Sequence, residues 1–329
     1  MAVSEIDPKF AKHLRTVAKA IRRGNVVPVL GAGANLCDRQ PKEPWSPGKN
    51  LPNGSELSCK LAKDYDCEVF DKSDLVRVSQ WIGLSIGTGE LYEELRKVFA
   101  REYEIPSLHR LLAELPAMIG AAPGQGPAEL IVTTNYDDLM ERALRAARPR
   151  VEYDLVRYVA QGPSTGLFVH EPPDGEEVVI TTPNTYTAVD PDRRTVVLKI
   201  HGTVDRDDRH EDSYVITEDH YIEYLTRTNP SELFPVHVLA KLLNSNFLFL
   251  GYGMRDWNLR VILHRIIEER RGLTWKSWAV QDAVDELDDE LWRTRDVTLQ
   301  QHRLSDYAIG LRAALEQAAR EDAAEDVVA

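Results

Sequence analysis

The sequence has few cysteines, no long apolar run and fewer basic than acidic side chains. Its three cysteines, Cys37, Cys59 and Cys67, form no CxxC pair, which argues against a disulfide framework and against a four-cysteine zinc ribbon. We therefore expect no bound metal and a structural or incidental role for Cys37. No apolar stretch is long enough to span a membrane, and the N-terminal MAVSEIDPKFAKHL lacks the apolar segment of a signal peptide. These features predict a cytoplasmic protein without membrane contact.

The charge balance is acidic, with 40 lysines and arginines against 53 aspartates and glutamates and a net charge of −13. This balance disfavours broad, non-specific contact with nucleic acid or anionic membrane, so we expect no direct nucleic-acid partner. A phosphorylated small ligand stays compatible with it, because a single pocket can be locally positive on an acidic protein. The 329 residues, 43% of them hydrophobic, suffice for one large domain or two modest ones.

Apolar strands alternate with amphipathic helices along most of the chain. The expected strands are VVPVL at 26–30, ELIVTT at 129–134, TVVLKI at 195–200, NFLFL at 246–250 and TWKSWAVQ at 274–281. Continuous apolar strands between helices predict an α/β fold with a doubly wound, mainly parallel, Rossmann-like sheet. Pro28 is unusual in this pattern, because proline is poorly tolerated in a central strand.

Three segments depart from this alternation. Residues from about 54 to 115 are mostly helical in pattern. Residues from about 149 to 195 are rich in proline, with short β-branched runs between turn signals, and predict an irregular β-rich insertion. After a main domain of residues 1–285, we expect residues 286–329 to form a C-terminal helical extension with an acidic tail.

Four of the expected strands end in chemically unusual turns. Leu30 leads into GAG, Val132 into TTNYD, Leu198 into KIHG and Leu250 into GYGMRD. In a doubly wound sheet, ligands bind outside the carboxyl ends of the strands. We therefore expect all four turns to lie at the same edge of the sheet and to enclose one ligand.

Two of these turns are rich in glycine. GAGAN at residues 31–35 could let a pyrophosphate approach the backbone amides closely, although Leu36 occupies the third glycine position of a GxGxxG pattern. A tight turn after a buried strand explains the same glycines as well. GYGMRDWNL repeats the design, with Asp256 as the expected helix cap. It suits either close contact with a ribose or phosphate or a simple capped turn.

The other two turns carry polar side chains. In TTNYDD, helix capping by Asn135 or Asp137 explains one or two of the polar residues but not the whole cluster. Asn135 has no titratable proton near neutral pH, but both functions of its amide can hold a water or a ligand hydroxyl. His201 directly follows an apolar strand and can act as an acid or base near neutral pH. A histidine with a purely structural role is the alternative.

In their order along the chain, the four motifs resemble those of the sirtuin-like NAD-consuming domains of the silent-information-regulator family, especially its bacterial antiphage-defence branch. VVPVLGAGANL resembles the first strand and glycine loop, IVTTNYD the asparagine motif, LKIHG the catalytic histidine motif, and FLFLGYGMRDWNL the late nucleotide-contacting turn. The resemblance spans about residues 24–280. LPNGSEL and DLVRVSQW match helical elements of a cap, so the resemblance implies that the helical segment at about 54–115 covers the site.

The resemblance implies NAD as the substrate, with no metal, and assigns most of the matching residues to NAD binding. The first glycine loop would line the pyrophosphate, a threonine would face the ribose, an aspartate would meet the nicotinamide amide, and the late turn would contact the adenosine half. These residues are Gly31, Ala32, Gly33 and Asn35 in the glycine loop, Thr134 and Asp137 in the asparagine motif, and Gly251 and Tyr252 in the late turn.

The resemblance also implies a reaction. Asn135 would orient the reacting ribose and water, and His201 would be the catalytic base of an NAD glycohydrolase that releases nicotinamide and ADP-ribose. Protein-deacylating members carry a zinc module with two cysteine pairs, whereas this chain has its proline-rich segment between Asn135 and His201. NAD-dependent protein deacylation is one alternative. A non-catalytic assembly module that senses NAD or ADP-ribose is another.

Defence-associated members imply that the activity is controlled, because unregulated loss of NAD would kill the host cell. The resemblance therefore implies an antiphage-defence effector that depletes NAD. Its control would come from a homo-oligomer or from a partner protein such as an ATPase or an Argonaute-type protein. No feature of the sequence names that partner.

Overall fold

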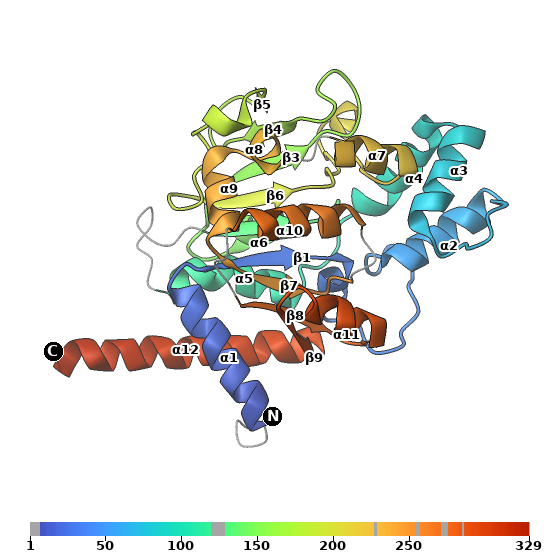
Figure 1. The fold of residues 1–329 in the computed structure, drawn as a ribbon. Coiled ribbons are helices and arrows are strands. Elements are labelled where there is room, and N and C mark those ends of the chain that lie inside the picture. Colours follow the sequence, from blue (N-terminus) through green and yellow to red (C-terminus); the bar gives the residue numbers. More distant parts are fainter. Residues whose placement is uncertain are drawn as a thin grey trace.

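The computed structural model describes residues 7–119, 129–226, 229–253, 257–270, 276–284 and 286–328. Within these residues, one sheet of nine strands has the order β5-β4-β3-β6-β2-β1-β7-β8-β9 (Figure 1). The strands are β1 Val26–Leu30, β2 Leu130–Thr133, β3 Tyr153–Tyr158, β4 Phe168–Glu171, β5 Val178–Ile180, β6 Thr195–Lys199, β7 Asn246–Leu250, β8 Ser277–Gln281 and β9 Val297–Gln301. All neighbours are parallel except β4, which is antiparallel to β3 and β5. The predicted α/β fold with a mainly parallel sheet is confirmed.

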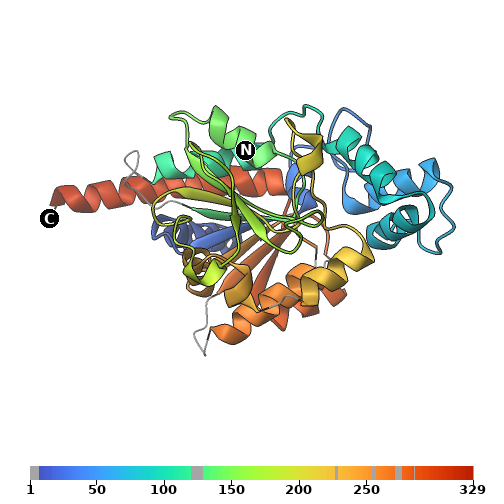
Figure 2. The same ribbon diagram turned by 90° about the horizontal axis from the view of Figure 1, so that it is seen from above.

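Helices cover both faces of the sheet (Figure 2). One face packs against α1, α5, α6 and α12, and the other against α7 to α11. The helices are α1 Pro8–Arg22, α2 Gly54–Asp64, α3 Leu75–Ser85, α4 Thr88–Phe99, α5 Ser107–Met118, α6 Leu139–Ala146, α7 Glu218–Thr226, α8 Pro230–Leu233, α9 Val236–Leu243, α10 Trp257–Glu269, α11 Glu286–Arg293 and α12 Leu304–Val328. Short 3₁₀ helices are η2 Ala32–Leu36, η3 Pro183–Thr185 and η4 Arg209–Glu211.

The strands place alternate residues in the two cores. In β1, Val26 and Leu30 belong to the core beneath α1, and Val27 and Val29 belong to the core beneath α7 to α11. Both sets are buried because the sheet is covered on both faces, which explains the continuous apolar sequence of the strand. Burial of each such side chain contributes about 1.5–3 kcal/mol. The two cores therefore fix the central strands and, with them, the turns at the strand ends.

Pro28 lies in the central strand and marks a break in its pairing. All five residues of β1 pair with β7, but only Val29 and Leu30 pair with β2. Proline has no backbone N–H to donate to a neighbouring strand. The sheet accommodates Pro28 because the pairing of β1 with β2 begins only after it.

Helices α2, α3 and α4 form a separate small core beyond the carboxyl ends of the strands, toward which the strand arrows of Figure 1 point. This core joins Leu61 of α2, Ile82 of α3 and Leu95 of α4 to Tyr214 and Ile216, which follow β6. Helix α5 differs, because it packs against α6 and α12. The segment predicted to be helical is therefore divided between the strand ends and one face of the sheet.

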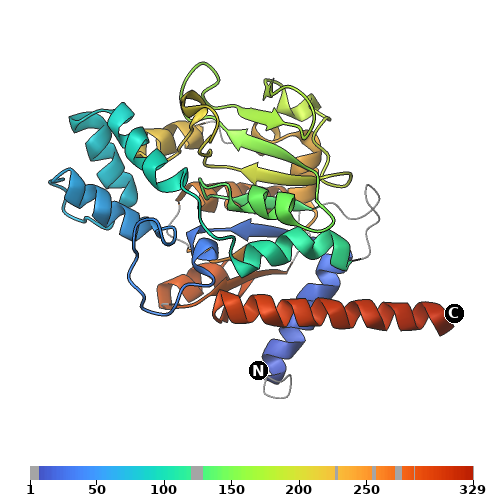
Figure 3. The ribbon, with the colours of Figure 1, turned by 180° about the vertical axis from the view of Figure 1, so that it is seen from behind.

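Segments at both ends of the strand order extend the sheet. Residues 149–195 contain β3, β4 and β5, and β3 pairs in parallel with β6. Residues 286–328 contain α11, β9 and α12, and β9 pairs in parallel with β8. The sequence did not predict β9. Helix α12 then packs against α1 and α5 on one face of the sheet, and α1 crosses it (Figure 3).

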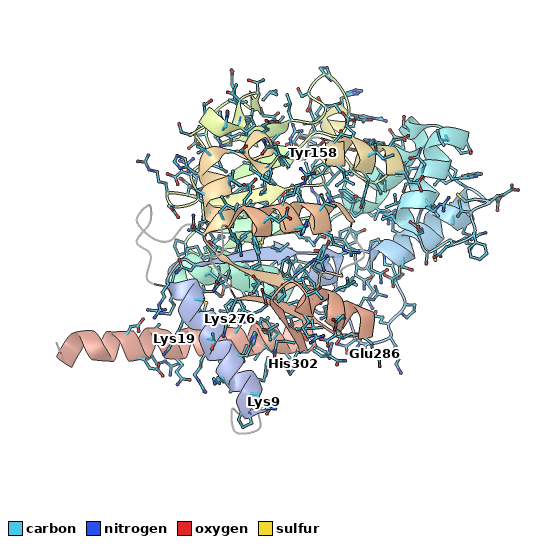
Figure 4. The ribbon with its side chains drawn as sticks, in the orientation of Figure 1. Lys9, Lys19, Tyr158, Lys276, Glu286 and His302 are labelled. Atoms are coloured by element: carbon cyan, nitrogen blue, oxygen red, sulfur yellow. The ribbon has the colours of Figure 1, made fainter. Side chains whose placement is uncertain are left out.

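Helix α1 is amphipathic, as its sequence indicates. Leu14, Val17 and Ile21 are buried against the sheet and α12, whereas the exposed Lys9 and Lys19 project from the outer side of the helix (Figure 4). Such a helix needs the sheet to cover its apolar stripe. Across the described residues, no helix combines the length and the apolar character that crossing a membrane requires.

Candidate functional site

A cavity of about 450 Å³ opens at the carboxyl ends of β1, β2, β6 and β7, which are adjacent in the sheet. We call it the strand-end pocket. Every residue that the sequence analysis singled out as catalytic or NAD-binding lines it. These residues are Gly31, Ala32, Gly33, Asn35, Thr134, Asn135, Asp137, His201, Gly251 and Tyr252. The four turns, which are far apart in the sequence, thus lie around one pocket.

Strand register explains why the two polar turns meet. Thr133 of β2 faces Lys199 of β6, so Asn135 and His201 each lie two residues beyond a facing pair. The ladder continues one step past the strands, because the N–H of Ile200 donates to the carbonyl oxygen of Thr133 at 3.1 Å. The parallel pairing of β2 with β6 therefore brings the asparagine and the histidine to the same edge.

The two glycine turns pack directly on each other. The N–H of Gly33 donates to the carbonyl oxygen of Gly251 at 2.9 Å. A Cβ atom on Gly33 would lie 2.7 Å from that oxygen, and a Cβ on Gly31 would lie 2.6 Å from it. Gly251 has a φ of +62°, and a Cβ there would lie 2.3 Å from the backbone nitrogen of Ala34. The contact between the turns by itself accounts for these three glycines.

Three polar side chains form a hydrogen-bonded chain along the pocket. Asn35 donates from Nδ2 to Oδ2 of Asp137 at 2.6 Å. Asn135 donates from Nδ2 to Oδ1 of Asn35 at 3.3 Å and to the carbonyl oxygen of Gly31 at 3.1 Å. An ionised carboxylate only accepts hydrogen bonds, so the amide nitrogen of Asn35 must face Asp137, and its oxygen must then face the nitrogen of Asn135. Asp137 thus orients both amides.

These contacts correct one expectation about this turn and decide between the two residues expected to cap the helix. Nδ2 of Asn135 is occupied within the protein, so a ligand would be held by Oδ1 rather than by both functions of the amide. The N-cap residue of α6 is Asp138, but its carboxylate binds Arg206 at 2.6 Å and does not cap the helix. The expected capping contact comes from Asp137, which accepts from the N–H of Leu139 at 3.1 Å.

His201 is buried at the rim of the pocket, with 3% of its surface exposed. Its ring lies 6.3 Å from that of Tyr224 in an edge-on arrangement and 6.0 Å from that of Tyr221, both on α7. The next residue, Gly202, has a φ of +83°, and a Cβ there would lie 2.2 Å from the carbonyl oxygen of Ser213. The glycine of KIHG is therefore required where the chain passes Ser213, and this contact fixes the backbone beside His201.

Residues from α2 to α4 close the pocket from the other side. Asn53 and Ser55 line it at the start of α2, together with Leu75 of α3 and Phe99 of α4. Asn53 caps α2 by a capping box. The N–H of Glu56 donates to Oδ1 of Asn53 at 2.8 Å, and the N–H of Asn53 donates to the carboxylate of Glu56 at 2.9 Å. None of these four residues is predicted from the sequence as a site residue, although the motif LPNGSEL marks the start of α2.

The late turn contributes mainly backbone to the pocket. The ring of Tyr252 packs 6.0 Å from Phe249 and 6.2 Å from Trp292, and Tyr252 has only 3% of its surface exposed. Because Tyr252 is almost fully buried, only a small part of its surface could contact a ligand in the pocket. Residues 254–256 lie outside the described residues, and the expected helix cap Asp256 is among them.

Comparison with known families identifies the domain. The model of the SIR2-like domain matches residues 129–300, which is just over half of the chain. The protein belongs to the SIR2-like family. Within the matched range lie Asn135, His201 and Gly251, while the first glycine turn and α2 to α4 lie outside it. The structure nevertheless brings the first glycine turn to the same pocket as the matched motifs.

Among curated proteins, this SIR2-like chain is similar to several bacterial proteins named NAD(+) hydrolase ThsA. It is 30% identical over 257 residues to that of Enterococcus faecium, a match of 77% of this chain and 42% of that protein. It is 24% identical over 253 residues to that of Cytobacillus dafuensis, covering 77% and 40%, and 26% identical over 264 residues to that of Bacillus cereus, covering 80% and 44%. The chain spans about two fifths of the length of the curated relatives it matches.

Proposed function

We propose that this SIR2-like domain hydrolyses NAD to nicotinamide and ADP-ribose in the strand-end pocket. One observation carries the proposal: Asn135 and His201, which the sequence marked for this chemistry, line one pocket together with both glycine turns. The relatives named as NAD(+) hydrolases support the choice of substrate. The volume of about 450 Å³ lies in the range of pockets that bind small molecules and cofactors.

The turns suggest how NAD would lie. The first glycine turn, from Gly31 to Asn35, would lie against the pyrophosphate at the start of η2, although the N–H groups of Gly31, Gly33 and Ala34 already donate to carbonyl oxygens within the protein. Gly251 and Tyr252 would contact the adenosine half. Thr134 would face the ribose next to the nicotinamide, and its hydroxyl already lies 3.4 Å from the carbonyl oxygen of Leu30. These roles follow the resemblance of the motifs, and the common pocket makes them compatible with one bound molecule.

Cleavage breaks the bond between nicotinamide and the ribose carbon C1′. The electron pair of that bond leaves with nicotinamide as the neutral base, and C1′ becomes oxocarbenium-like, as in other glycosidic cleavages. Oδ1 of Asn135 would orient a water or a ribose hydroxyl at this carbon. His201 would take a proton from the water, or from a ribose hydroxyl, while the water oxygen bonds to C1′. ADP-ribose and nicotinamide are the products.

The surroundings of both residues favour this chemistry. Nδ2 of Asn135 is held by two acceptors, so the amide plane is fixed before a ligand arrives, which lowers the cost of orienting the water. His201 is enclosed by the rings of Tyr221 and Tyr224. A site shielded from bulk water strengthens each electrostatic contact with developing charge. Asp137 orients both amides and could also accept a hydrogen bond from the nicotinamide amide.

An enzyme that hydrolyses NAD must be regulated in the cell, and this need suggests a biological role. Unregulated hydrolysis would deplete the NAD of the cell, so we propose a cytoplasmic antiphage-defence effector that is silent until it is activated. A homo-oligomer, or a partner of ATPase or Argonaute type, would supply that control. Tests of activity therefore need the chain together with any proteins encoded beside it.

Incubation with NAD followed by chromatography of the products tests the proposal. We expect nicotinamide and ADP-ribose in equal amounts, without any acylated peptide being present. Turnover that requires an acetylated peptide and yields O-acyl-ADP-ribose would instead identify a deacylase. Thermal stabilisation by NAD or ADP-ribose without turnover, even with the neighbouring proteins present, would identify a sensing module.

A further inference from the structure

Lys199 is a fully buried lysine in the strand that leads to His201. It occupies the last position of β6, two residues before His201, and none of its surface is exposed. Lysine is almost never fully buried unless it is paired, because removing its charge from water is costly. The contacts of its ammonium group should therefore explain why it is there.

The ammonium group of Lys199 has two partners from the segment that follows β2. Nζ donates to the carbonyl oxygen of Asp137 and to Oε1 of Glu141, the latter at 3.0 Å. Glu141 lies in the first turn of α6 and has 3% of its surface exposed. Burial raises the pKa of Glu141, and the charge of Lys199 opposes that shift. Lys199 thus bridges β6, the turn after β2 and helix α6.

The carbonyl that Lys199 holds belongs to the residue that orients the catalytic asparagine. The side chain of Asp137 accepts from Asn35 at 2.6 Å and from the N–H of Leu139 at 3.1 Å. Asn35 in turn accepts from Nδ2 of Asn135. A continuous set of hydrogen bonds therefore runs from Lys199, through Asp137 and Asn35, to Asn135.

A purely structural ion pair between Lys199 and Glu141 would not need the contact with the carbonyl oxygen of Asp137. A buried pair of opposite charges can often be replaced by apolar side chains of similar size without loss of stability. An apolar side chain cannot donate to the carbonyl of Asp137, however. The carbonyl contact therefore separates a role in folding from a role in positioning the turn.

We infer that Lys199 is a positioning residue: by holding the carbonyl of Asp137, it fixes the turn that carries Asn135 against the strand that leads to His201. The kinetic part of this inference rests on the proposed NAD hydrolysis. The structural part, that Lys199 fixes the turn, does not depend on which reaction the pocket performs.

Arg157 provides a matched control on the neighbouring strand. It faces Lys199 across β3 and β6 and has 1% of its surface exposed. It pairs with Glu171, and its Nη2 also binds Glu177 at 3.0 Å and Glu211 at 3.1 Å. None of these partners belongs to the turn of Asn135. Arg157 is thus a buried cation in register with Lys199, one strand farther from β2.

The experiment compares two double variants, Lys199→Met with Glu141→Met, and Arg157→Met with Glu171→Met. The first removes a buried pair of charges, and the second removes the buried Arg157 with its partly exposed partner Glu171. We expect the Lys199 pair to lower kcat for nicotinamide release about 100-fold, because a small displacement of a reacting group has an effect of that size. We expect the Arg157 pair to keep kcat within about threefold of wild type. Wild-type kcat in the folded Lys199 double variant would overturn the inference.

Hydrogen exchange at the turn supplies a readout that needs no turnover. In the Lys199 double variant, the amides of Asn135 and Leu139 should exchange about tenfold faster, whereas the Arg157 double variant should leave them unchanged. If the wild-type chain releases no nicotinamide even together with the proteins encoded beside it, the proposed function fails, and exchange alone decides the inference. Unchanged exchange in the Lys199 variant would overturn it.

Two single variants cover the case in which the double variant does not fold. Glu141→Gln keeps the contact of Lys199 with the Asp137 carbonyl, and Lys199→Gln shortens the side chain and removes its charge. We expect kcat and the exchange rates to change markedly in Lys199→Gln and little in Glu141→Gln. Equal effects of the two substitutions would show that only the ion pair matters and would overturn the inference.

Discussion

Asn135 and His201 occupy equivalent positions just after neighbouring parallel strands, each two residues beyond the facing pair Thr133 and Lys199 of β2 and β6. Both line the strand-end pocket. An asparagine that can orient water and a histidine that can take its proton are thus placed by the register of the sheet. Because the strands are buried on both faces, this placement is tied to the core of the domain.

The first prediction concerns these two residues directly. His201→Ala should lower nicotinamide release by about 10²- to 10⁴-fold, the usual contribution of a positioned base. Asn135→Ala should lower it by about 100-fold, because the water or ribose is no longer oriented. Thermal unfolding should show that both variants remain folded. His237→Ala on α9, away from the pocket, is the control and should keep the wild-type rate. Full activity in both site variants would remove the assignment.

The second prediction concerns the contact between the glycine turns. Gly251→Ala should destabilise the domain by about 1–3 kcal/mol through its positive φ alone, with a further cost from the Cβ contact with Ala34. Binding of ADP-ribose should weaken as well. Gly253→Ala is the matched control, because a Cβ there meets no atom of the described part of the chain within 4 Å. Equal stability of the two variants in urea unfolding would contradict this account of the turn.

The third prediction concerns the helix that begins at the pocket. Asn53→Ala removes the capping box of α2 and should cost about 1 kcal/mol of stability. Because Asn53 also lines the pocket, the variant should bind ADP-ribose more weakly. Asp74→Ala removes the cap of α3, where Asp74 accepts from two backbone N–H groups, but Asp74 does not line the pocket. Calorimetry should show weaker binding only for Asn53→Ala.

The fourth prediction concerns stability at low pH. Burial lowers the pKa of His109 from 6.5 to about 4, so the unfolded chain binds a proton that the folded chain does not bind between these values. Above pH 6.5 His109 is neutral in both states and does not reduce the free energy of unfolding. As the pH falls from 6.5 toward 4, protonation of the unfolded chain lowers the free energy of unfolding, by about 3 kcal/mol at most. His109→Leu should flatten this part of the curve in urea unfolding.

The sheet and the meeting of the four turns at one edge could be predicted from the sequence, because both depend on local pattern. Val27 and Val29 belong to a continuous apolar strand, which indicates a parallel sheet covered on both faces. Once the sheet is parallel, the turns after its strands must share an edge, so Gly31, Asn135 and His201 could be grouped without coordinates.

Other features could not be predicted because they depend on contacts between distant segments. Lys199 is a polar residue in an apolar strand, and only the fold shows that Glu141 and the carbonyl of Asp137 receive its charge. The strand β9, with the sequence VTLQQ, lies at the sheet edge and lacks the apolar run of a central strand. Leu75 and Phe99 line the strand-end pocket because α2 to α4 pack over the strand ends.

A structure of the His201→Ala variant with NAD bound tests the central claim most directly. The account predicts one NAD molecule in the strand-end pocket, with its pyrophosphate against the turn from Gly31 to Asn35 and its nicotinamide ribose within hydrogen-bond reach of Oδ1 of Asn135. NAD bound elsewhere on the domain, or in the pocket with its adenosine end at Asn135, would contradict it.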